Sequence, residues 1–207
     1  MVSILNYGFG NIASISNMLK KIGASNKVIS TAKEIDEATT LILPGIGKFD
    51  HAIKQIETLG LLDSLNNAAL VRRIPTLGIC LGMQLMTNGS EEGQLQGLGW
   101  VDASTCRVDG EKYKIRVPHM GWNLVKVKKN MGCFMEQEVE EQKFYFVHSY
   151  AVYCKNPEDI LMTTNYGEEF VSAFAKDNIV GVQFHPEKSH KFGVSFFRHF
   201  VSTYCND

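Results

Sequence analysis

The sequence has 207 residues and lacks any long apolar run. No stretch approaches the roughly 18 consecutive apolar residues that a membrane-spanning helix needs. It also lacks an excess of charge of one sign, because 21 Lys and Arg stand against 22 Asp and Glu, for a net charge of −1. These two absences predict a chain that binds neither a membrane nor a nucleic acid.

Cysteine pairs at metal-binding or redox spacing are also missing. The five cysteines are odd in number and no two form a C-x-x-C pair; they are Cys80, Cys106, Cys133, Cys154 and Cys205. This pattern argues against a disulfide framework and a zinc site, and it favours reduced thiols. The first residues are not basic and no long apolar segment follows them, so no signal peptide is expected and we predict a cytoplasmic location. The residues leave open whether the four cysteines other than Cys80 have a function.

The order of the predicted elements indicates the fold class. Apolar strands at 2–6, 27–30 and 40–44 alternate with helices at 12–22 and 49–70, which is typical of a parallel sheet covered by helices on both faces. Further strands are expected at 76–79, 98–101, 105–108, 123–128, 143–150, 161–163, 171–174 and 179–184, and further helices at 81–88 and 192–204. We therefore predict a single α/β domain over residues 1–207, with a mostly parallel central sheet and a smaller antiparallel extension.

A glycine-rich loop follows the first predicted strand. Gly8, Gly10 and Ala13 match the pattern G-x-G-x-x-A, which also occurs in dinucleotide-binding proteins. The next predicted strand ends in Ser30 and Thr31, where such a site needs a carboxylate for the ribose. Nucleotide binding is therefore disfavoured, and an ordinary turn into a helix is the simpler interpretation.

Cys80 lies between the predicted strand 76–79 and a predicted helix that begins at Leu81. Gly78 and Gly82 stand two residues before it and two residues after it. This spacing is typical of a nucleophile elbow, with sulfur in place of the serine oxygen. Glycines permit the strained turn, and a helix N-terminus favours the thiolate. A buried cysteine in an ordinary turn is the competing interpretation, so this pattern alone leaves catalysis open.

His185 and Glu187 flank Pro186 at the end of the last predicted strand. Sites in open α/β sheets form at the carboxyl ends of the strands, so these side chains are expected to meet Cys80. We predict that Cys80 is the nucleophile, that His185 transfers protons and that Glu187 orients the imidazole. Four histidines are rival bases, although none has an acidic residue as close: His119, His148, His190 and His199.

The segment Gly45-Ile46-Gly47 follows the strand predicted at 40–44. It is not a phosphate-binding loop, because the spacing of that motif is absent. Two glycines allow the backbone to turn its N–H groups toward a ligand, which suits an oxyanion hole. The N–H groups of Gly45, Ile46, Gly47 and Leu81 are therefore candidate donors to an oxyanion, with an ordinary turn as the alternative.

Taken together, these segments resemble the class I, or triad, glutamine amidotransferases. The resemblance is carried by residues 77–86 around Cys80 and by residues 183–189 around His185, and the other matching stretches are 6–11, 43–47, 118–123 and 145–150. Within this family the chain resembles the glutaminase subunits of imidazole glycerol phosphate synthases. The resemblance implies that L-glutamine is hydrolysed to glutamate and ammonia through a thioester on Cys80, without a cofactor or a metal ion.

The resemblance also implies binding roles and a partner. The residues that would hold the glutamine are Gln84, Glu92, Ser149 and Tyr150. The implied partner is a (βα)₈-barrel cyclase subunit of histidine biosynthesis, which receives the ammonia within a heterodimer. The residues that would face this partner are Asn11, Trp122, Tyr145 and Lys188. Without the barrel and its substrate, the glutaminase is expected to be nearly idle.

Other interpretations stay open. Residues 86–92, 99–103 and 189–193 resemble paralogous glutaminase subunits that serve amidotransferases of bacterial surface-sugar biosynthesis, so the ammonia acceptor is not settled. A cysteine peptidase or a DJ-1-like thiol protein uses a similar elbow, but Gln84 and the His-Pro-Glu order argue against both. A regulatory subunit without catalysis is disfavoured because all three triad residues are present.

Overall fold

The computed structural model describes residues 1–128 and 142–204. The strands within these residues are β1 Val2–Leu5, β2 Asn26–Ile29, β3 Leu41–Leu43, β4 Thr76–Ile79, β5 Ala103–Arg107, β6 His119–Val127, β7 Gln142–His148, β8 Tyr150–Cys154, β9 Ile160–Tyr166, β10 Glu168–Lys176 and β11 Ile179–Val182. The α-helices are α1 Ile12–Lys21, α2 Ala32–Asp36, α3 Phe49–Thr58, α4 Leu62–Asn66, α5 Leu81–Leu85, α6 Gly110–Tyr113 and α7 His190–Tyr204. A π-helical turn continues α4 over Asn67–Val71, and 3₁₀ turns span Pro157–Asp159 and Pro186–Lys188.

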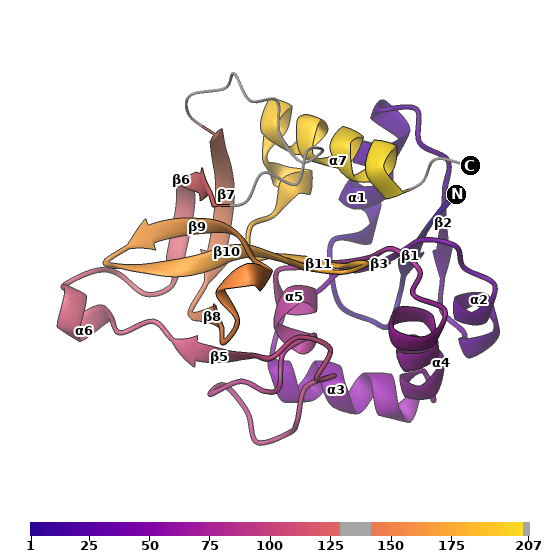
Figure 1. Ribbon diagram of the computed structural model, residues 1–207, viewed down its shortest axis with the longest axis horizontal. Coiled ribbons are helices and arrows are strands. Elements are labelled where there is room, and N and C mark those ends of the chain that lie inside the picture. Colours follow the sequence, from indigo (N-terminus) through magenta and orange to yellow (C-terminus); the bar gives the residue numbers. More distant parts are fainter. Residues whose placement is uncertain (129–141, 205–207) are drawn as a thin grey trace.

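All these strands belong to one mixed sheet (Figure 1). Its order is β2-β1-β3-β4-β11-β10-β9-β6-β7, and β8 pairs with both β10 and β5. The first five strands in this order run parallel, and the remaining pairs are antiparallel. The α/β class with an antiparallel extension is therefore confirmed. The single domain predicted over residues 1–207 reaches beyond the described residues and stays a prediction.

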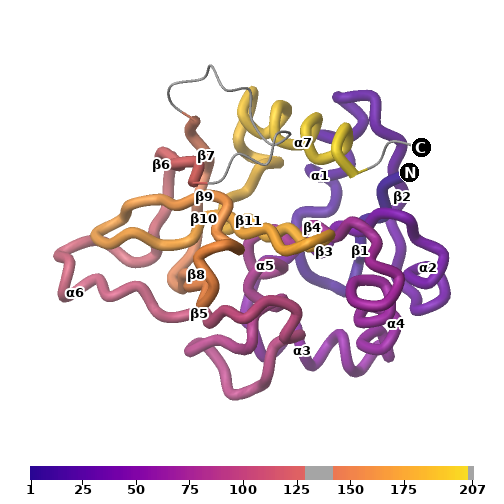
Figure 2. Tube along the Cα trace, viewed as in Figure 1, coloured from indigo at the N-terminus to yellow at the C-terminus, as the bar shows by residue number. Residues whose placement is uncertain are grey.

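Helices cover both faces of the parallel strands. In Figure 1, α1 and α7 lie on one face, and α3, α4 and α5 lie on the other. Successive strand residues point to opposite faces, so Ile42 packs in the apolar cluster of Ile15 and Phe196. Its neighbours Leu41 and Leu43 belong to the cluster on the opposite face. The tube in Figure 2 shows β4 beside β3 and β11, which places the end of β4 in the middle of the parallel strands.

The segment after β4 differs from its prediction in two ways. The helix predicted at 81–88 ends at Leu85, and the strand predicted at 98–101 is wrong. Both differences have one cause. The backbone N–H of Leu98 donates to the carbonyl of Leu85, and those of Trp100 and Val101 donate to the carbonyl of Met86. The 98–101 segment thus satisfies the carbonyls at the end of α5, rather than pairing with a strand.

The antiparallel extension contains two further differences. The single strand predicted at 143–150 is two strands, β7 and β8, which part at Ser149. The chain changes partner at this residue, because β7 pairs with β6 and β8 pairs with β5. The strand predicted at 123–128 begins earlier, at His119, so much of the segment 117–123, for which the sequence predicts an irregular conformation, belongs to β6. Alternation of apolar and polar residues does not reveal where a strand exchanges one partner for another.

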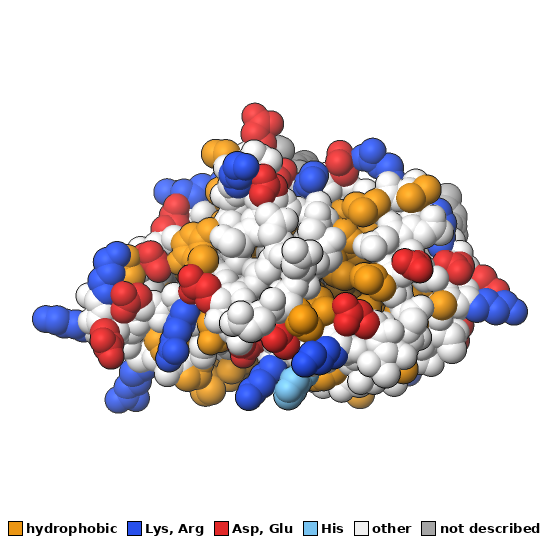
Figure 3. All heavy atoms as spheres, turned by 90° about the horizontal axis from the view of Figure 1, so that it is seen from below, with side chains coloured by type: hydrophobic (Ala, Val, Ile, Leu, Met, Phe, Trp, Pro, Cys, Tyr) orange, Lys and Arg blue, Asp and Glu red, His pale blue; other side chains and the backbone are white. Residues whose placement is uncertain are grey.

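Figure 3 shows one face of the molecule, on which acidic and basic side chains alternate with apolar ones. This mixture agrees with a net charge close to zero. Among the helices of residues 1–128 and 142–204, none has the length and hydropathy that a membrane crossing requires.

The contact between α5 and β3 generates the first prediction. A Cβ atom at Gly82 would clash with the carbonyl oxygen of Leu43, whereas one at Gly89 would meet its nearest atom at 3.8 Å. We expect Gly82→Ala to lower the free energy of unfolding by about 3 kcal/mol, because the backbones must move apart. Urea unfolding measures this loss, with Gly89→Ala as the control. Equal midpoints for Gly82→Ala and the unchanged protein would contradict the packing described here.

Candidate active site

Cys80 occupies a strained backbone conformation between β4 and α5. Its φ and ψ are 54° and −110°, in a region that residues other than glycine rarely adopt. The backbone N–H of Cys80 donates to the carbonyl of Val182 on the neighbouring strand β11, at 2.8 Å. A Cβ atom at Gly78 would lie 2.8 Å from the backbone of Gly82. The turn thus has the predicted elbow geometry, and the two glycines allow it to close.

The side chain of Cys80 lines a pocket of about 280 Å³. All four residues expected to hold glutamine line the same pocket: Gln84, Glu92, Ser149 and Tyr150. Three of the four candidate oxyanion donors also line it: Ile46, Gly47 and Leu81. Gly45 is not among the lining residues. It packs against the start of α5, where a Cβ atom would lie 2.6 Å from the Gly82 nitrogen.

His185 reaches the pocket because β4 and β11 are neighbouring parallel strands. Ile79 and Val182 are in register, so the residues that follow them lie at the same edge of the sheet. His185 lines the pocket, and its Nδ1 atom lies 2.8 Å from Oε1 of Glu187. Both side chains are 1% exposed. The structure therefore brings together the three residues of the predicted triad, although they lie far apart in sequence.

The electrostatics of the pocket favour a protonated His185. Burial by itself lowers the pKa of His185, but the charge of an ionised Cys80 and the contact with Glu187 outweigh it and raise this pKa to about 10. The Nε2 atom of His185 is buried and has no hydrogen-bond partner among the described residues. A thiolate at Cys80 and an imidazolium at His185 thus stabilise each other.

Two rival bases, His119 and His148, form a neutral pair, and His148 lines the pocket. The Nδ1 atom of His148 lies 2.8 Å from the carbonyl oxygen of Tyr150, and since this oxygen only accepts, Nδ1 carries a hydrogen. The Nε2 atom of His148 then accepts from Nδ1 of His119 at 3.0 Å. Burial lowers the pKa of His148 to about 3 and that of His119 to about 4. Neither is suited to accept a proton near neutral pH.

The other two rival histidines lie outside the pocket. His190 stacks on Trp122, with ring centroids 5.5 Å apart, and His199 contacts the carbonyl of Ser195 on its own helix α7. Among the four rivals and His185, only His185 has a carboxylate hydrogen-bonded to its ring in the described residues.

Glu92 is held in place by the start of α3. Its Oε2 atom accepts a hydrogen bond from the backbone N–H of Phe49 at 2.9 Å, a favourable position for a carboxylate at a helix N-terminus. Asp50 accepts from the backbone N–H groups of Gln94 and Leu95 and so ties the same loop to α3. Sequence reasoning missed Asp50, because the loop and the helix lie some 40 residues apart.

Tyr7 is a second residue that sequence reasoning missed. It is buried, and its hydroxyl donates to the carbonyl of Pro44 at 2.7 Å, directly before Gly45. Burial and the charge of Cys80 raise the pKa of Tyr7, so it stays a hydrogen-bond donor. The only signal was a tyrosine in the loop after the first strand, a position that does not by itself indicate contact with the 44–47 turn.

The residues expected to face a partner lie near the pocket, on the surface. Trp122 is 46% exposed, and its ring meets the ring of Tyr145 edge to face. The Nζ atom of Lys188 lies 5.8 Å from the centroid of the Tyr145 ring. Asn11 precedes α1, and α1 packs against the 186–188 turn that carries Lys188. Trp122, Tyr145 and Lys188 therefore lie beside one another.

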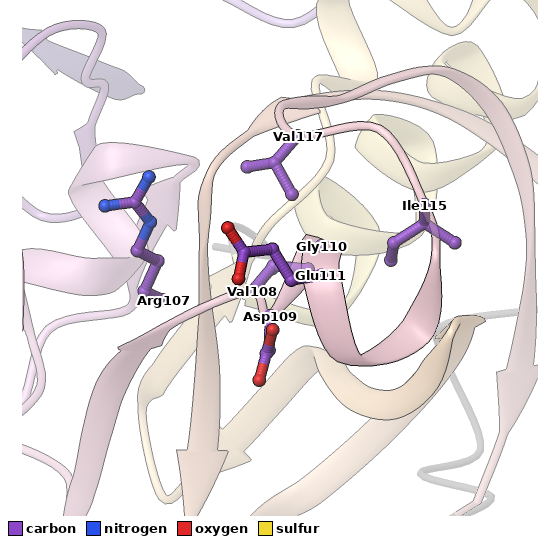
Figure 4. A pocket seen from close by; sticks show the side chains of 7 residues that line it. All are labelled: Arg107, Val108, Asp109, Gly110, Glu111, Ile115 and Val117. Atoms are coloured by element: carbon purple, nitrogen blue, oxygen red, sulfur yellow. The ribbon is translucent and has the colours of Figure 1, made fainter.

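A larger hollow of about 650 Å³ lies beside α6. Figure 4 shows that its lining side chains offer a guanidinium, two carboxylates and apolar groups, but no thiol and no imidazole. None of the predicted site residues lines it. The smaller pocket at Cys80 is the one whose groups can perform nucleophilic catalysis.

The remaining cysteines show no catalytic arrangement in the described residues. Cys154 is half-buried, and burial raises its pKa to about 12, so its thiol stays protonated. Cys106 is a free thiol on β5, and Cys133 and Cys205 lie outside the described residues. Within residues 1–128 and 142–204 no three His, Cys, Asp or Glu side chains are placed to hold a metal ion.

Comparison with known proteins points to one family. The family model described as "Glutamine amidotransferase class-I" matches residues 3–202. The imidazole glycerol phosphate synthase subunit HisH 2 of Methanococcus maripaludis is 49% identical over 97% of this chain and 98% of its own. The subunit of the same name from Pseudomonas aeruginosa is 45% identical, over 97% and 98%.

Solved structures support the fold. The chain aligns to a crystal structure of a glutamine amidotransferase with a TM-score of 0.76 at 16% identity, over 99% of both chains. It aligns to PurLQS from Thermotoga maritima with a TM-score of 0.76 at 15% identity, over 98% of this chain and 97% of the other.

The neutral histidine pair generates a prediction about stability. Both pKa values lie below the ordinary 6.5, so between pH 6.5 and pH 4 the unfolded chain binds protons that folded His119 and His148 do not. Stability is therefore present above pH 6.5 and falls as the pH is lowered, by about 2 to 3 kcal/mol for each histidine. Urea unfolding between pH 4 and pH 8 measures this loss.

Two features make this test specific. His185 is protonated in both states between pH 4 and pH 6.5, so its contribution is constant there and is lost only as the pH rises toward about 10. His119→Gln is expected to reduce the loss of unfolding free energy between pH 6.5 and pH 4. His51→Gln, on the exposed side of α3, is expected to leave this loss unchanged. A wild-type protein equally stable at pH 4.5 and pH 7 would contradict the prediction.

Proposed function

The chain belongs to the class I glutamine amidotransferases, and we propose that it is the glutaminase subunit of an imidazole glycerol phosphate synthase. In this role it hydrolyses L-glutamine to glutamate and ammonia in the cytoplasm and passes the ammonia to a (βα)₈-barrel cyclase in histidine biosynthesis. The observation that carries the proposal is the convergence of Cys80, His185 and the four glutamine-binding candidates on one pocket.

Cys80 begins the reaction as a thiolate. Its sulfur forms a bond to the side-chain amide carbon of glutamine, and the electron pair of the C=O bond moves onto the oxygen. Ile46, Gly47 and Leu81 line the pocket, and their backbone N–H groups are the candidate donors to this developing negative charge. Cys80 and Gly47, which flank the pocket on two different segments, both have a positive φ, of 54° and 119°.

His185 then acts first as an acid and later as a base. It gives its proton to the departing nitrogen, so ammonia leaves and a thioester remains on Cys80. The sulfur of a thioester carries no charge, so the contribution of Cys80 to the raised pKa of His185 is lost, while burial still lowers this pKa and Glu187 still raises it. The proton affinity of His185 is therefore lower in the thioester than in the free enzyme. The neutral ring accepts a proton from water, the hydroxide adds to the thioester, and the thiolate and glutamate are released.

The four candidate glutamine-binding residues contact different parts of the substrate. Glu92 offers one carboxylate oxygen to the α-ammonium, since its other oxygen already accepts from the Phe49 N–H. Both amide hydrogens of Gln84 are used within the protein, by the Tyr150 carbonyl and by Gln183, so Gln84 can only accept from the substrate. Ser149 and Tyr150 close the far wall of the pocket.

The partner surface is an apolar face of β6 and β7. Met120, Trp122 and Leu124 alternate along β6 and are 62%, 46% and 41% exposed. On β7 they stand opposite Val147, Tyr145 and Lys143. Val147 also lines the pocket, so this face is continuous with the site that releases ammonia. A partner seated on it covers exposed apolar area and receives ammonia without passing it through bulk water.

Glutamate release from glutamine tests the proposal. We expect slow release by the chain alone and roughly tenfold or faster release with a cyclase barrel and its nucleotide substrate, as binding coupled between two sites requires. Cys80→Ala is expected to abolish release in both cases. Full activity without the barrel would contradict the coupling. No stimulation of a folded chain would favour the surface-sugar paralogue as the correct function.

Trp122 provides a test of the partner surface. We expect Trp122→Asp to weaken binding to the cyclase barrel at least about tenfold, because it places a charge at the centre of an apolar face. Leu59→Asp is the matched control, since Leu59 follows α3 and is 43% exposed, close to the 46% of Trp122. Calorimetric titration measures both affinities. Equal losses from the two substitutions would remove Trp122 from the interface.

A further inference from the structure

We propose that Gln183 is a further catalytic residue, whose side-chain amide donates a hydrogen bond to the sulfur of Cys80 and stabilises the thiolate. This inference rests on the proposed function only in taking Cys80 as the nucleophile. Gln183 directly follows β11, is 0% exposed, and has its Nε2 atom 3.7 Å from Cys80 Sγ. Its backbone N–H donates to the Ser172 carbonyl at 2.9 Å, which holds the residue in place.

The orientation of the Gln183 amide follows from its neighbours. Gln84 presents its Nε2 atom to the carbonyl oxygen of Tyr150 at 3.1 Å, and a carbonyl can only accept. The same Nε2 atom lies 3.0 Å from Oε1 of Gln183. A rotated Gln183 amide would set two N–H₂ groups against each other, so the oxygen of Gln183 faces Gln84. The nitrogen is thereby directed at the sulfur.

The Tyr150 carbonyl is fixed in turn by the histidine pair. It also accepts from Nδ1 of His148, whose Nε2 accepts from His119. The Nε2 atom of His119 accepts from the side-chain amide of Asn123 on β6 at 3.2 Å. One hydrogen-bond network therefore runs from β6 to the nucleophile, and Gln183 is its last donor. A donor held in this way needs no reorganisation when the charge on sulfur forms.

Cys80 needs such a donor. Its Sγ atom lies 3.9 Å from the carbonyl oxygen of Val147, which can accept a thiol hydrogen but repels a thiolate. Gln183 offsets this repulsion with the positive end of an N–H dipole, and hydrogen bonds to charged groups are stronger than those between neutral groups. It cannot protonate the sulfur, because an amide keeps its hydrogens. His185 supplies the opposite charge and Gln183 supplies a fixed dipole.

Alkylation of Cys80 by iodoacetamide tests the inference in the free chain, without glutamine. We expect Gln183→Leu to lower the alkylation rate of Cys80 at pH 7 about tenfold. The pH at which this rate increases is expected to be higher than in the wild type, because a hydrogen bond to a charged group is lost. Gln183→Glu, which keeps the acceptor for Gln84 and removes the donor to sulfur, is expected to act in the same direction. Mass spectrometry of the Cys80 peptide separates this reaction from alkylation of other cysteines.

Ser172→Ala is the matched control, because Ser172 is also 0% exposed and adjoins Gln183 through the backbone. It is expected to leave the rate unchanged. A purely structural role for Gln183 would raise KM for glutamine and leave the alkylation profile as in the wild type, and this result in a folded variant would overturn the inference. Slower alkylation of Gln183→Leu would still support the inference if the wild-type chain hydrolysed no glutamine even with the cyclase barrel and its nucleotide substrate, and that second result would reject the proposed function.

Should both Gln183 variants fail to fold, the wild-type protein supplies the measurement. The side-chain amide hydrogens of Gln183, observed by nuclear magnetic resonance, are expected to shift with pH as Cys80 ionises, and the shift is expected to vanish in Cys80→Ala. The same pH dependence in both proteins would overturn the inference.

Discussion

The site depends on the close approach of α5 to β3. Without side chains at Gly78 and Gly82, the first turn of α5 lies directly against the backbone of β3, and Cys80 is forced into a conformation with φ of 54°. That conformation costs free energy of order 1–3 kcal/mol, which the surrounding packing must supply. In return the sulfur stands at the edge of the sheet, beside the neighbouring strand β11 that leads to Gln183, His185 and Glu187.

Burial makes the charges of this site interdependent. Cys80, His185 and Glu187 are each largely closed off from solvent, so their charges interact more strongly than they would in water. The thiolate holds the proton on His185, and the carboxylate of Glu187 holds the ring. Consumption of the thiolate in a thioester changes the proton affinity of His185 at the step that needs a base, so one imidazole can serve as acid and base in turn.

The antiparallel strands supply the rest of the pocket wall and the surface beside it. β7 and β8 part at Ser149, and this break supplies the pocket wall of His148, Ser149 and Tyr150. The same pair of strands bears the exposed apolar face beside Trp122. A partner that docks there touches β6, the strand that carries Asn123 and His119, and these side chains connect through hydrogen bonds to Gln84 and Gln183.

Local sequence determined the features that depend on neighbouring residues. The glycines around Cys80 permit a tight turn there, and the apolar runs specified the parallel strands and most flanking helices, because each signal lies within a few residues. Tertiary structure decided where α5 ends, where β7 gives way to β8, and that Asp50, Tyr7 and Gln183 contact site segments. These outcomes depend on hydrogen bonds between residues from 13 positions apart, for Leu85 and Leu98, to 103 positions apart, for Cys80 and Gln183. No local pattern encodes which carbonyl or N–H in another element a residue will meet.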